Sequence, residues 1–244
     1  MSGSTDRLVA VDIGGTHARF VIATIGDDGT IALDEPVTLK TEDHASFQTA
    51  WEDFGRIQGG DLPKAVSIAV AGPVGGDVIR FTNNPWIIRP ALVKEKLKVD
   101  AYTIVNDFGA VGHAVARAPN SDFLHLTGPD EPLAAEGTIS IMGPGTGLGV
   151  AHVWRDGAGN YRVQATEGGH IDFAPHDMIE DAILARLRRR HNRVSVERIV
   201  SGPAIVDIYA TLARMENRAT MEEDDRTIWQ NGMDGSDSLA AAAV

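Results

Sequence analysis

The sequence predicts an α/β fold, on three observations. Short β-branched runs alternate with helical patterns over the first half of the chain. Two loops rich in glycine and threonine each follow such a run directly. The chain has 244 residues, 43% of them hydrophobic and 23% charged, which is enough for one or two domains with a buried core.

The first half opens with three strand patterns in succession, without a helix between them. Strands are predicted over residues 8–11, 18–25, 31–39, 65–71, 78–81 and 102–105, with a hairpin turn at 26–29. Helices are predicted over 46–57, 90–97 and 107–118. Because a plain doubly wound sheet has a helix after most strands, this order predicts a mixed sheet.

The second half follows a turn-rich stretch, residues 119–136, and we place a domain boundary near its start. The prediction is a small α/β lobe over 1–117 and a larger α+β lobe over 118–244. In the larger lobe we expect strands at 138–142, 147–154 and 161–165, and helices whose apolar faces lie within 179–187 and 205–212. The basic run 186–190 is expected to be a solvated helix face.

The last part of the sequence has a weaker pattern. Helical spacing decays after residue 215, and residues 239–244 look like the opening turns of a helix. Natural chains more often end on a frayed polar tail than on an apolar helix start. We therefore expect a chain that is shortened at its C-terminus.

Charge and composition exclude several classes of partner. The net charge is −12, with an isoelectric point near 5.0, so an acidic surface would repel nucleic acid and anionic membranes. The absence of cysteine excludes a disulfide framework and a thiolate metal site. No apolar run approaches the ~20 residues that span a bilayer, and the N-terminus lacks the apolar core of a signal peptide. We expect a cytoplasmic protein.

The two glycine loops are candidates for phosphate binding. Glycine lets backbone N–H groups approach an anion without an intervening Cβ, and a threonine hydroxyl adds a donor. For the first loop an ordinary tight turn is an equal alternative, whereas four glycines within 143–149 favour a phosphate site. Asp12, at the end of the preceding strand, would face a metal ion that bridges the phosphates. The candidate phosphate ligands are Gly14, Gly15, Thr16, Gly143, Gly145, Thr146 and Gly147.

Polar residues at other junctions are candidates for substrate binding and catalysis. Asn106 and Asp107 lie where a strand ends and a helix begins, so a helix cap is the simpler interpretation and a base for a substrate hydroxyl is the functional one. Glu167 and His170 flank two glycines after a strand, and with one imidazole they fit polyol recognition better than a metal site. Glu197 is either a first-turn helix acid or a further ligand.

These motifs, in this order, resemble the bacterial glucokinase family of the hexokinase and actin-like ATPase superfamily. The matching stretches are residues 12–19, 68–73, 82–86, 104–108, 143–151, 167–175 and 194–203. The resemblance implies a two-lobed, ribonuclease H-like fold with mixed sheets flanked by helices. It also implies an active site in the cleft between the lobes.

The resemblance implies ATP-dependent phosphorylation of D-glucose at the 6-hydroxyl, with Mg²⁺. Asp107 would be the general base and would also contact the sugar. Asn84, Asn106, Glu167, His170 and Glu197 would bind the sugar hydroxyls. Asp12 would lie near the metal ion, and the seven glycine-loop residues named above would bind the phosphates of ATP.

Other interpretations stay open at this point. The family's adenosine-binding Gly-Gly segment and returning C-terminal helix are not recognisable, which agrees with a shortened chain and leaves room for a non-catalytic sugar-binding domain. A kinase for mannose or fructose is a further alternative, and so is a homodimeric assembly. A sugar-sensing repressor is disfavoured, because about seven residues before the first strand leave no room for a DNA-binding module.

Overall fold

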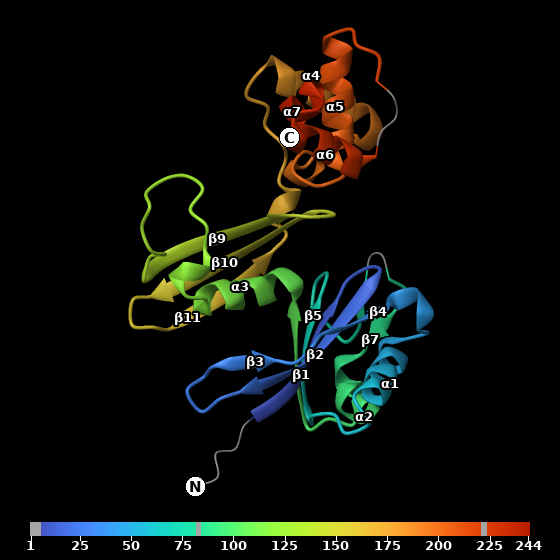
Figure 1. Cartoon of the computed structure of the whole chain (residues 1–244), viewed down its shortest axis with the longest axis vertical. Coiled ribbons are helices and arrows are strands. Elements are labelled where there is room, and N and C mark those ends of the chain that lie inside the picture. Colours follow the sequence, from blue (N-terminus) through green and yellow to red (C-terminus); the bar gives the residue numbers. More distant parts are fainter. Residues whose placement is uncertain (1–5, 82–83, 221–223) are drawn as a thin grey trace. The chain divides into compact units, whose positions relative to one another are not determined.

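The computed structural model describes residues 6–81, 84–220 and 224–244. It divides into two compact units, Met1–Pro119 and Asn120–Val244, which appear in blue to green and in yellow-green to red (Figure 1). Each unit has its own sheet and its own apolar core.

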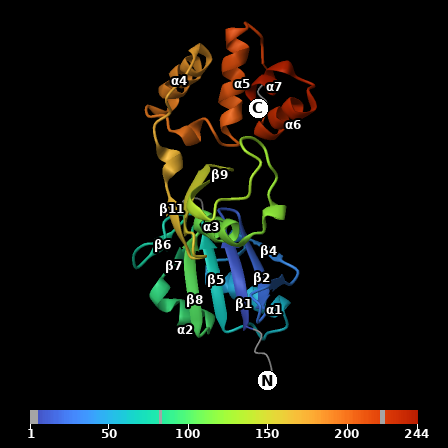
Figure 2. The same ribbon diagram turned by 90° about the vertical axis from the view of Figure 1, so that its left-hand side faces the viewer.

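The first unit is built on a six-stranded mixed sheet in the order β3-β2-β1-β5-β8, and β4 also pairs with β2. β1 is antiparallel to β2 and parallel to β5, which is in turn parallel to β8. Figure 2 shows β8, β5, β1 and β2 side by side. The mixed sheet that the sequence predicts is therefore confirmed. The strands are β1 (Asp6–Ile13), β2 (His17–Ile25), β3 (Ile31–Leu33), β4 (Val37–Lys40), β5 (Ala65–Val70) and β8 (Ala101–Asn106).

The prediction of one strand over 31–39 is wrong, because this stretch forms two separate strands, β3 and β4. β3 pairs with one end of β2, at Ala23–Ile25, whereas β4 pairs with the other end, at His17–Phe20. Pro36 lies in the break, where it has no N–H to donate to a sheet. The two halves thus share β2 without forming one continuous strand.

Helices complete the first unit. α1 (Phe47–Ile57) begins at Ser46, whose side chain accepts from Thr49 N in a capping box. α2 (Val93–Leu97) follows a 3₁₀ helix at Pro90–Leu92, and α3 (Asp107–Arg117) follows β8 directly. Aromatic rings of α1 pack on the sheet, where Phe54 lies 5.1 Å from Phe20 between ring centroids. A small two-stranded sheet pairs β6 (Ile79–Arg80) with β7 (Ile87–Ile88).

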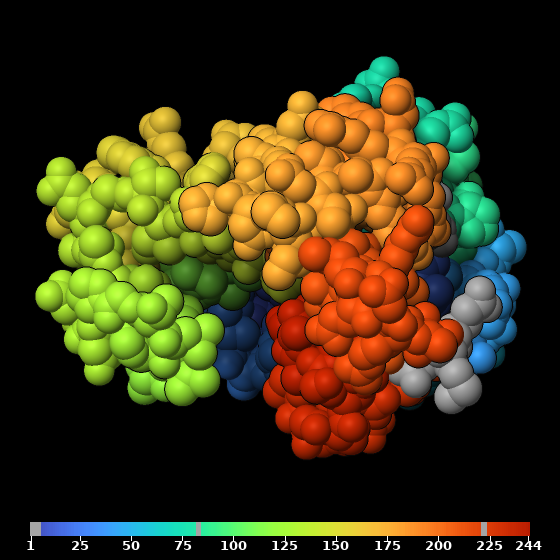
Figure 3. Space-filling model, turned by 90° about the horizontal axis from the view of Figure 1, so that it is seen from above, coloured from blue at the N-terminus to red at the C-terminus, as the bar shows by residue number. Residues whose placement is uncertain are grey.

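The second unit combines a small sheet with a group of helices. β10 is the central strand of an antiparallel sheet, paired with β9 on one side and β11 on the other. α5, α6 and α7 share one apolar core, and they form one orange-to-red body in the space-filling view (Figure 3). The elements are β9 (Glu136–Pro144), β10 (Leu148–Asp156), β11 (Tyr161–Thr166), α4 (Met178–His191), α5 (Ala204–Met215), α6 (Asp225–Asp234) and α7 (Ser238–Ala243).

Two features of this unit differ from the sequence-based expectation. The basic run is not wholly a solvated face, because Arg186 and Arg190 of α4 both contact the buried carboxylate of Asp207 in α5. A helix, α6, also lies within the polar segment whose pattern decays, and it begins at Asp224, whose side chain accepts from Thr227 N. Within the described residues, no helix combines the length and apolar composition of a membrane span.

Candidate active site

The first glycine loop connects β1 to β2. Gly14 N donates to His17 O at 2.9 Å, which closes the turn. Asp12 lies at the end of β1, directly across from Arg19 on β2, and the Arg19 guanidinium donates to its carboxylate at 3.0 Å. Arg19 was not among the predicted site residues, although it lies within a stretch that matches the family. The Arg19 side chain is 62% exposed and that of Asp12 is 48% exposed, so the Asp12 carboxylate is partly open to solvent beside the loop.

Asn84 is buried beside this loop, with 6% of its surface exposed. Its amide nitrogen donates to Gly14 O at 3.2 Å, and its amide oxygen accepts from Trp86 N at 2.9 Å. The role of Asn84 as a sugar ligand stays a prediction, since both ends of its amide contact the protein here. Thr82 and Asn83, from the same matching stretch, lie outside the described residues.

Asn106 and Asp107 occupy the junction of β8 and α3. Asn106 caps the helix, because its side-chain oxygen accepts from Gly109 N at 3.0 Å while its amide nitrogen donates to Gly72 O at 3.2 Å. The simpler of its two interpretations therefore holds, and a contact with substrate stays a prediction. The cap also holds Asp107 at the first turn of α3, at the carboxyl end of a parallel strand.

Asp107 is only partly exposed, and its electrostatic environment differs from that of a surface carboxylate. Burial raises the pKa of Asp107 above its usual value, and the negative charge of Asp12 raises it further. The hydrogen bond from Phe108 N, at 2.8 Å, partly opposes this shift. A carboxylate with a raised pKa is a better proton acceptor, which is the property that a general base needs.

The second glycine loop is a tight hairpin between β9 and β10. Gly143 and Pro144 pair within the ladder, opposite Gly149 and Leu148, so the loop itself is Gly145, Thr146 and Gly147. Gly145 N donates to Gly147 O at 2.8 Å. Gly202 N donates to Gly145 O at 2.8 Å, so a segment far along the chain also holds this hairpin.

Three predicted sugar ligands, Glu167, His170 and Glu197, gather near this hairpin in the second unit. His170 Nε2 lies 3.7 Å from a Glu167 oxygen and 4.0 Å from a Glu197 oxygen. The other Glu197 oxygen accepts from Leu148 N at 2.9 Å, directly after the loop. The Glu197 side chain is 24% exposed and that of Glu167 is 63% exposed. Glu197 thus contacts both His170 and the backbone at the candidate phosphate loop.

Close packing explains a glycine between these ligands. A Cβ at Gly169 would collide with the carbonyl oxygen of Leu148, so the turn that presents His170 can lie this close to β10 only with glycine. Arg193 also donates to His170 O at 2.6 Å, a contact that sequence reasoning did not identify. Both contacts join segments separated in sequence, which no local pattern reveals.

The structure therefore brings the predicted residues into two sets. Asp12, the first loop, Asn84, Asn106 and Asp107 belong to the first unit, and the second loop with Glu167, His170 and Glu197 belongs to the second unit. Among the residues that the structure describes, no three carboxylate or imidazole side chains are grouped so as to hold a metal ion.

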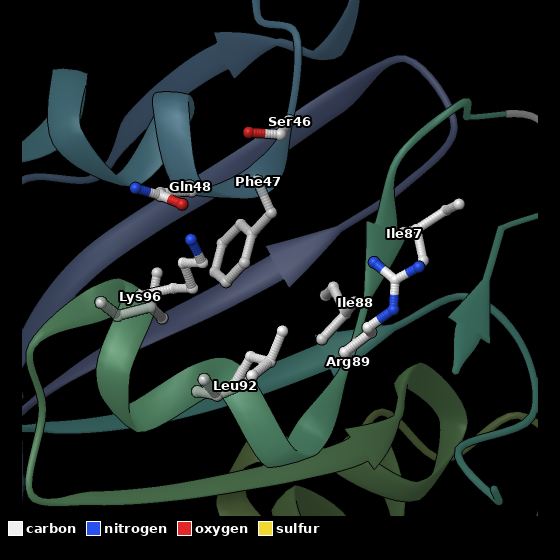
Figure 4. Close-up of a pocket in the computed structure, with 10 residues that line it drawn as sticks. Ser46, Phe47, Gln48, Ile87, Ile88, Arg89, Leu92 and Lys96 are labelled. Atoms are coloured by element: carbon white, nitrogen blue, oxygen red, sulfur yellow. The ribbon is translucent and has the colours of Figure 1, made fainter. Parts of the chain in front are cut away.

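A cavity of about 180 Å³ lies elsewhere in the first unit, among the start of α1, β7 and α2 (Figure 4). Phe47, Ile88 and Leu92 line it, with Arg89 and Lys96 at its edges. None of the predicted site residues lines this cavity, so it is separate from the candidate active site.

Comparison with known proteins gives consistent matches. The glucokinase family model matches residues 8–244. A glucokinase of Zymomonas mobilis is 54% identical over 238 residues, which cover 98% of this chain and 73% of that protein. A glucokinase of Paramagnetospirillum magneticum is 34% identical, with the same two shares of coverage.

Solved structures with the same fold are also kinases. The crystal structure of a glucokinase from an Antarctic psychrotroph has a TM-score of 0.79 and 28% identity, over 98% of this chain and 74% of its own. A glucokinase from Balamuthia mandrillaris, in complex with glucose, has a TM-score of 0.76 at 22% identity and covers 98% of this chain and 72% of its own. The predicted α/β fold of the hexokinase and actin-like ATPase type is confirmed.

Proposed function

We propose a function from the premise that this chain belongs to the glucokinase family: it transfers the γ-phosphoryl group of ATP to the 6-hydroxyl of D-glucose. The observation that carries this proposal is the 54% identity to a glucokinase over 98% of the chain. The products are glucose 6-phosphate and ADP. The chain spans about 73% of the length of that relative.

Asp107 serves as the general base of this reaction. The oxygen of the 6-hydroxyl attacks the γ-phosphorus, the bond from that phosphorus to the bridging oxygen of ADP breaks, and the hydroxyl proton passes to the Asp107 carboxylate. Burial and the neighbouring charge of Asp12 support this role, because they raise the pKa of Asp107. In a loose phosphoryl-transfer transition state, positioning and charge neutralisation supply most of the rate, so modest basicity is sufficient.

Hydrogen bonds to several ring hydroxyls give the selectivity for glucose. We assign these bonds to Asn106, Asp107, Glu167, His170 and Glu197, with Asn84 as the remaining predicted ligand. A sugar that lacks one hydroxyl, or presents it differently, leaves a buried polar group without a partner, which costs about 1–3 kcal/mol. The position of His170, 3.7 Å from a Glu167 oxygen and 4.0 Å from a Glu197 oxygen, supports a shared ligand.

The two glycine loops bind the phosphates, and Mg²⁺ fits beside Asp12. Mg²⁺ prefers oxygen ligands and usually takes one or two carboxylates, with phosphate oxygens and water completing its shell. The half-exposed Asp12 carboxylate near the end of β1 suits that role. Asp12 would hold the ion, which would neutralise charge on the phosphates, and the N–H groups of the loop backbone would hold the phosphates themselves.

The same proposal includes the two lobes, the cellular location and the oligomeric state. The two units correspond to a small lobe over 1–117 and a large lobe over 118–244. The location is the cytoplasm, which the lack of cysteine favours. The proposed assembly is a homodimer, and sedimentation analysis would test it.

Glucose-dependent ADP release tests the function directly. We expect the wild-type chain to release ADP only with glucose present and to form a product that glucose-6-phosphate dehydrogenase oxidises. Parallel assays with mannose and fructose should give lower kcat/KM. Turnover that is faster with either sugar would assign a different hexose, and nucleotide-independent glucose binding without ADP release would favour a sugar-binding domain.

A further inference from the structure

We propose that Thr41 and Asn84 are positioning residues that hold the first phosphate loop with its N–H groups turned toward the nucleotide. This inference rests on the proposed function, since it concerns the loop that binds ATP. Neither residue would need to touch a substrate for this role.

Three successive carbonyl groups of the loop are held by these two residues. Asn84 Nδ2 donates to Gly14 O at 3.2 Å, Thr41 Oγ1 donates to Gly15 O at 2.9 Å, and Thr41 N donates to Thr16 O at 3.0 Å. Both donors belong to the buried polar residues of the chain, with 3% exposure for Thr41 and 6% for Asn84. A buried donor without its acceptor costs more than an exposed one, so these contacts hold the loop firmly.

A series of hydrogen bonds through Trp86 connects Asn84 to Thr41. Trp86 N donates to the Asn84 side chain at 2.9 Å, and the Trp86 indole donates to His44 O at 2.8 Å. His44 N donates in turn to Thr41 O at 3.3 Å. Trp86 is 2% exposed, so this support is part of the core of the first unit.

Because the peptide unit is planar, fixing the direction of a carbonyl group also fixes the direction of the N–H group of the next residue. No peptide bond in the described residues is cis, and in a trans peptide the N–H points opposite to the C=O of the same unit. Because the carbonyls of Gly14 and Gly15 face Asn84 and Thr41, the N–H groups of Gly15 and Thr16 point the other way. A phosphate on that side meets donors, and no loop carbonyl is left to repel it.

Two substitutions remove one donor each. Asn84→Asp replaces the amide nitrogen with an oxygen that repels Gly14 O but still accepts from Trp86 N. Thr41→Val removes the hydroxyl at nearly constant volume and retains the backbone N–H. Thr41→Ser is the matched control, because it keeps the hydroxyl.

Steady-state kinetics with ATP and glucose varied separately give the first readout. We expect KM for ATP to rise about tenfold in Asn84→Asp and in Thr41→Val, the value of one lost hydrogen bond. In Thr41→Val, KM for glucose should stay within about twofold, and Thr41→Ser should resemble the wild type. An unchanged KM for ATP in both folded variants overturns the proposal, and so does a rise in KM for glucose alone in Thr41→Val.

Hydrogen exchange without ligands gives a readout that does not depend on turnover. The amides of Gly14 and Thr41 donate to carbonyls of this loop region, His17 O and Thr16 O, so a loosened loop exposes them. We expect both amides to exchange faster in Asn84→Asp and Thr41→Val but not in Thr41→Ser. Equal exchange in all four proteins overturns the positioning role. A wild-type chain without glucose-dependent ADP release refutes the proposed function, and the exchange data still decide the role of Thr41 and Asn84.

Discussion

The position of Asp107 in the first unit affects both its chemistry and its contribution to stability. Its pKa is raised, first by burial and then by the charge of Asp12, so its ionised form is less stable in the folded chain than in water. At acidic pH, below the ordinary carboxyl pKa of about 3.9, both states are protonated and there is no penalty. As the pH rises through the folded-state pKa of Asp107, its carboxyl group ionises in the folded chain. The folded state then bears the full cost of burying this charge.

Asp107→Asn should therefore lower activity and raise stability together. We expect kcat to fall by about 10²–10⁴, since the base is lost, while glucose binding by calorimetry is retained. Thermal unfolding at pH 7 should show a higher midpoint than the wild type, and this difference should vanish near pH 3. Equal rates for the two proteins would contradict the role of Asp107 as base.

Gly147 is a second residue whose identity matters for the site. A Cβ there would collide with a carboxylate oxygen of Glu197, the same oxygen that accepts from Leu148 N. We expect Gly147→Ala to displace this carboxylate and lower kcat/KM about tenfold or more, with the unfolding midpoint nearly unchanged. Gly75→Ala is the matched control, because no atom lies within 4 Å of its added Cβ. Wild-type kinetics for Gly147→Ala would show that the position of Glu197 is unimportant.

At the scale of elements, His44 joins the end of β4 to α1. Its ring contacts two acceptors, Lys40 O through Nδ1 and an Asp53 oxygen through Nε2, each at 3.0 Å. Both nitrogens can donate only when the ring is protonated. Burial alone would lower the pKa of His44, but the hydrogen bond to Lys40 O and the Asp53 carboxylate outweigh burial and raise the pKa.

This contact predicts a pH-dependent stability. Because the folded pKa lies above the unfolded value of about 6.5, the stabilisation is fully present below that value and is lost as the pH rises through the folded pKa. We expect chemical denaturation to give a smaller free energy of unfolding at pH 9 than at pH 6. Asp53→Asn should weaken this dependence, so equal pH profiles for the two proteins would contradict the prediction.

The α4–α5 pair depends on one buried carboxylate. Asp207 accepts from Arg190 at 2.6 Å and from Arg186 at 3.2 Å, and its side chain is only 12% exposed. Asp207→Asn should reduce the free energy of unfolding by about 2 kcal/mol, because both charge-assisted hydrogen bonds weaken. Asp130→Asn, on an exposed loop, should change it by less than about 0.5 kcal/mol. Denaturant unfolding of both variants measures this, and similar losses would contradict the assignment.

Element prediction succeeded where the pattern is local. The starts of α1 and α3 follow from side chains within three residues of the helix, Ser46 and Asn106, and the structure confirms both helices. The strand over 31–39 failed, since its division depends on which end of β2 each half pairs with. α6 was missed because its polar sequence becomes helical by packing Ile228 into the core of α5 and α7.

For the whole molecule, the net charge of −12 opposes the approach of an anionic nucleotide. Salt screens this repulsion, with a Debye length of about 10 Å at 0.1 M. We therefore expect KM for Mg·ATP to fall about twofold as KCl rises from about 20 to 200 mM, whereas KM for uncharged glucose stays constant. A KM for ATP that rises with salt would instead indicate local attraction that outweighs the net charge.

The sequence by itself determined the α/β class and the family and predicted the residues of the candidate site, because a loop, a cap or an amphipathic face depends on neighbours within a few positions. Only the tertiary structure decided how those residues are held. Thr41 reaches Gly15 across 26 positions, Glu197 reaches Leu148 across 49, and Asn84 reaches Gly14 across 70. Such contacts arise when sheet order and packing bring distant segments together, so no local pattern contains them.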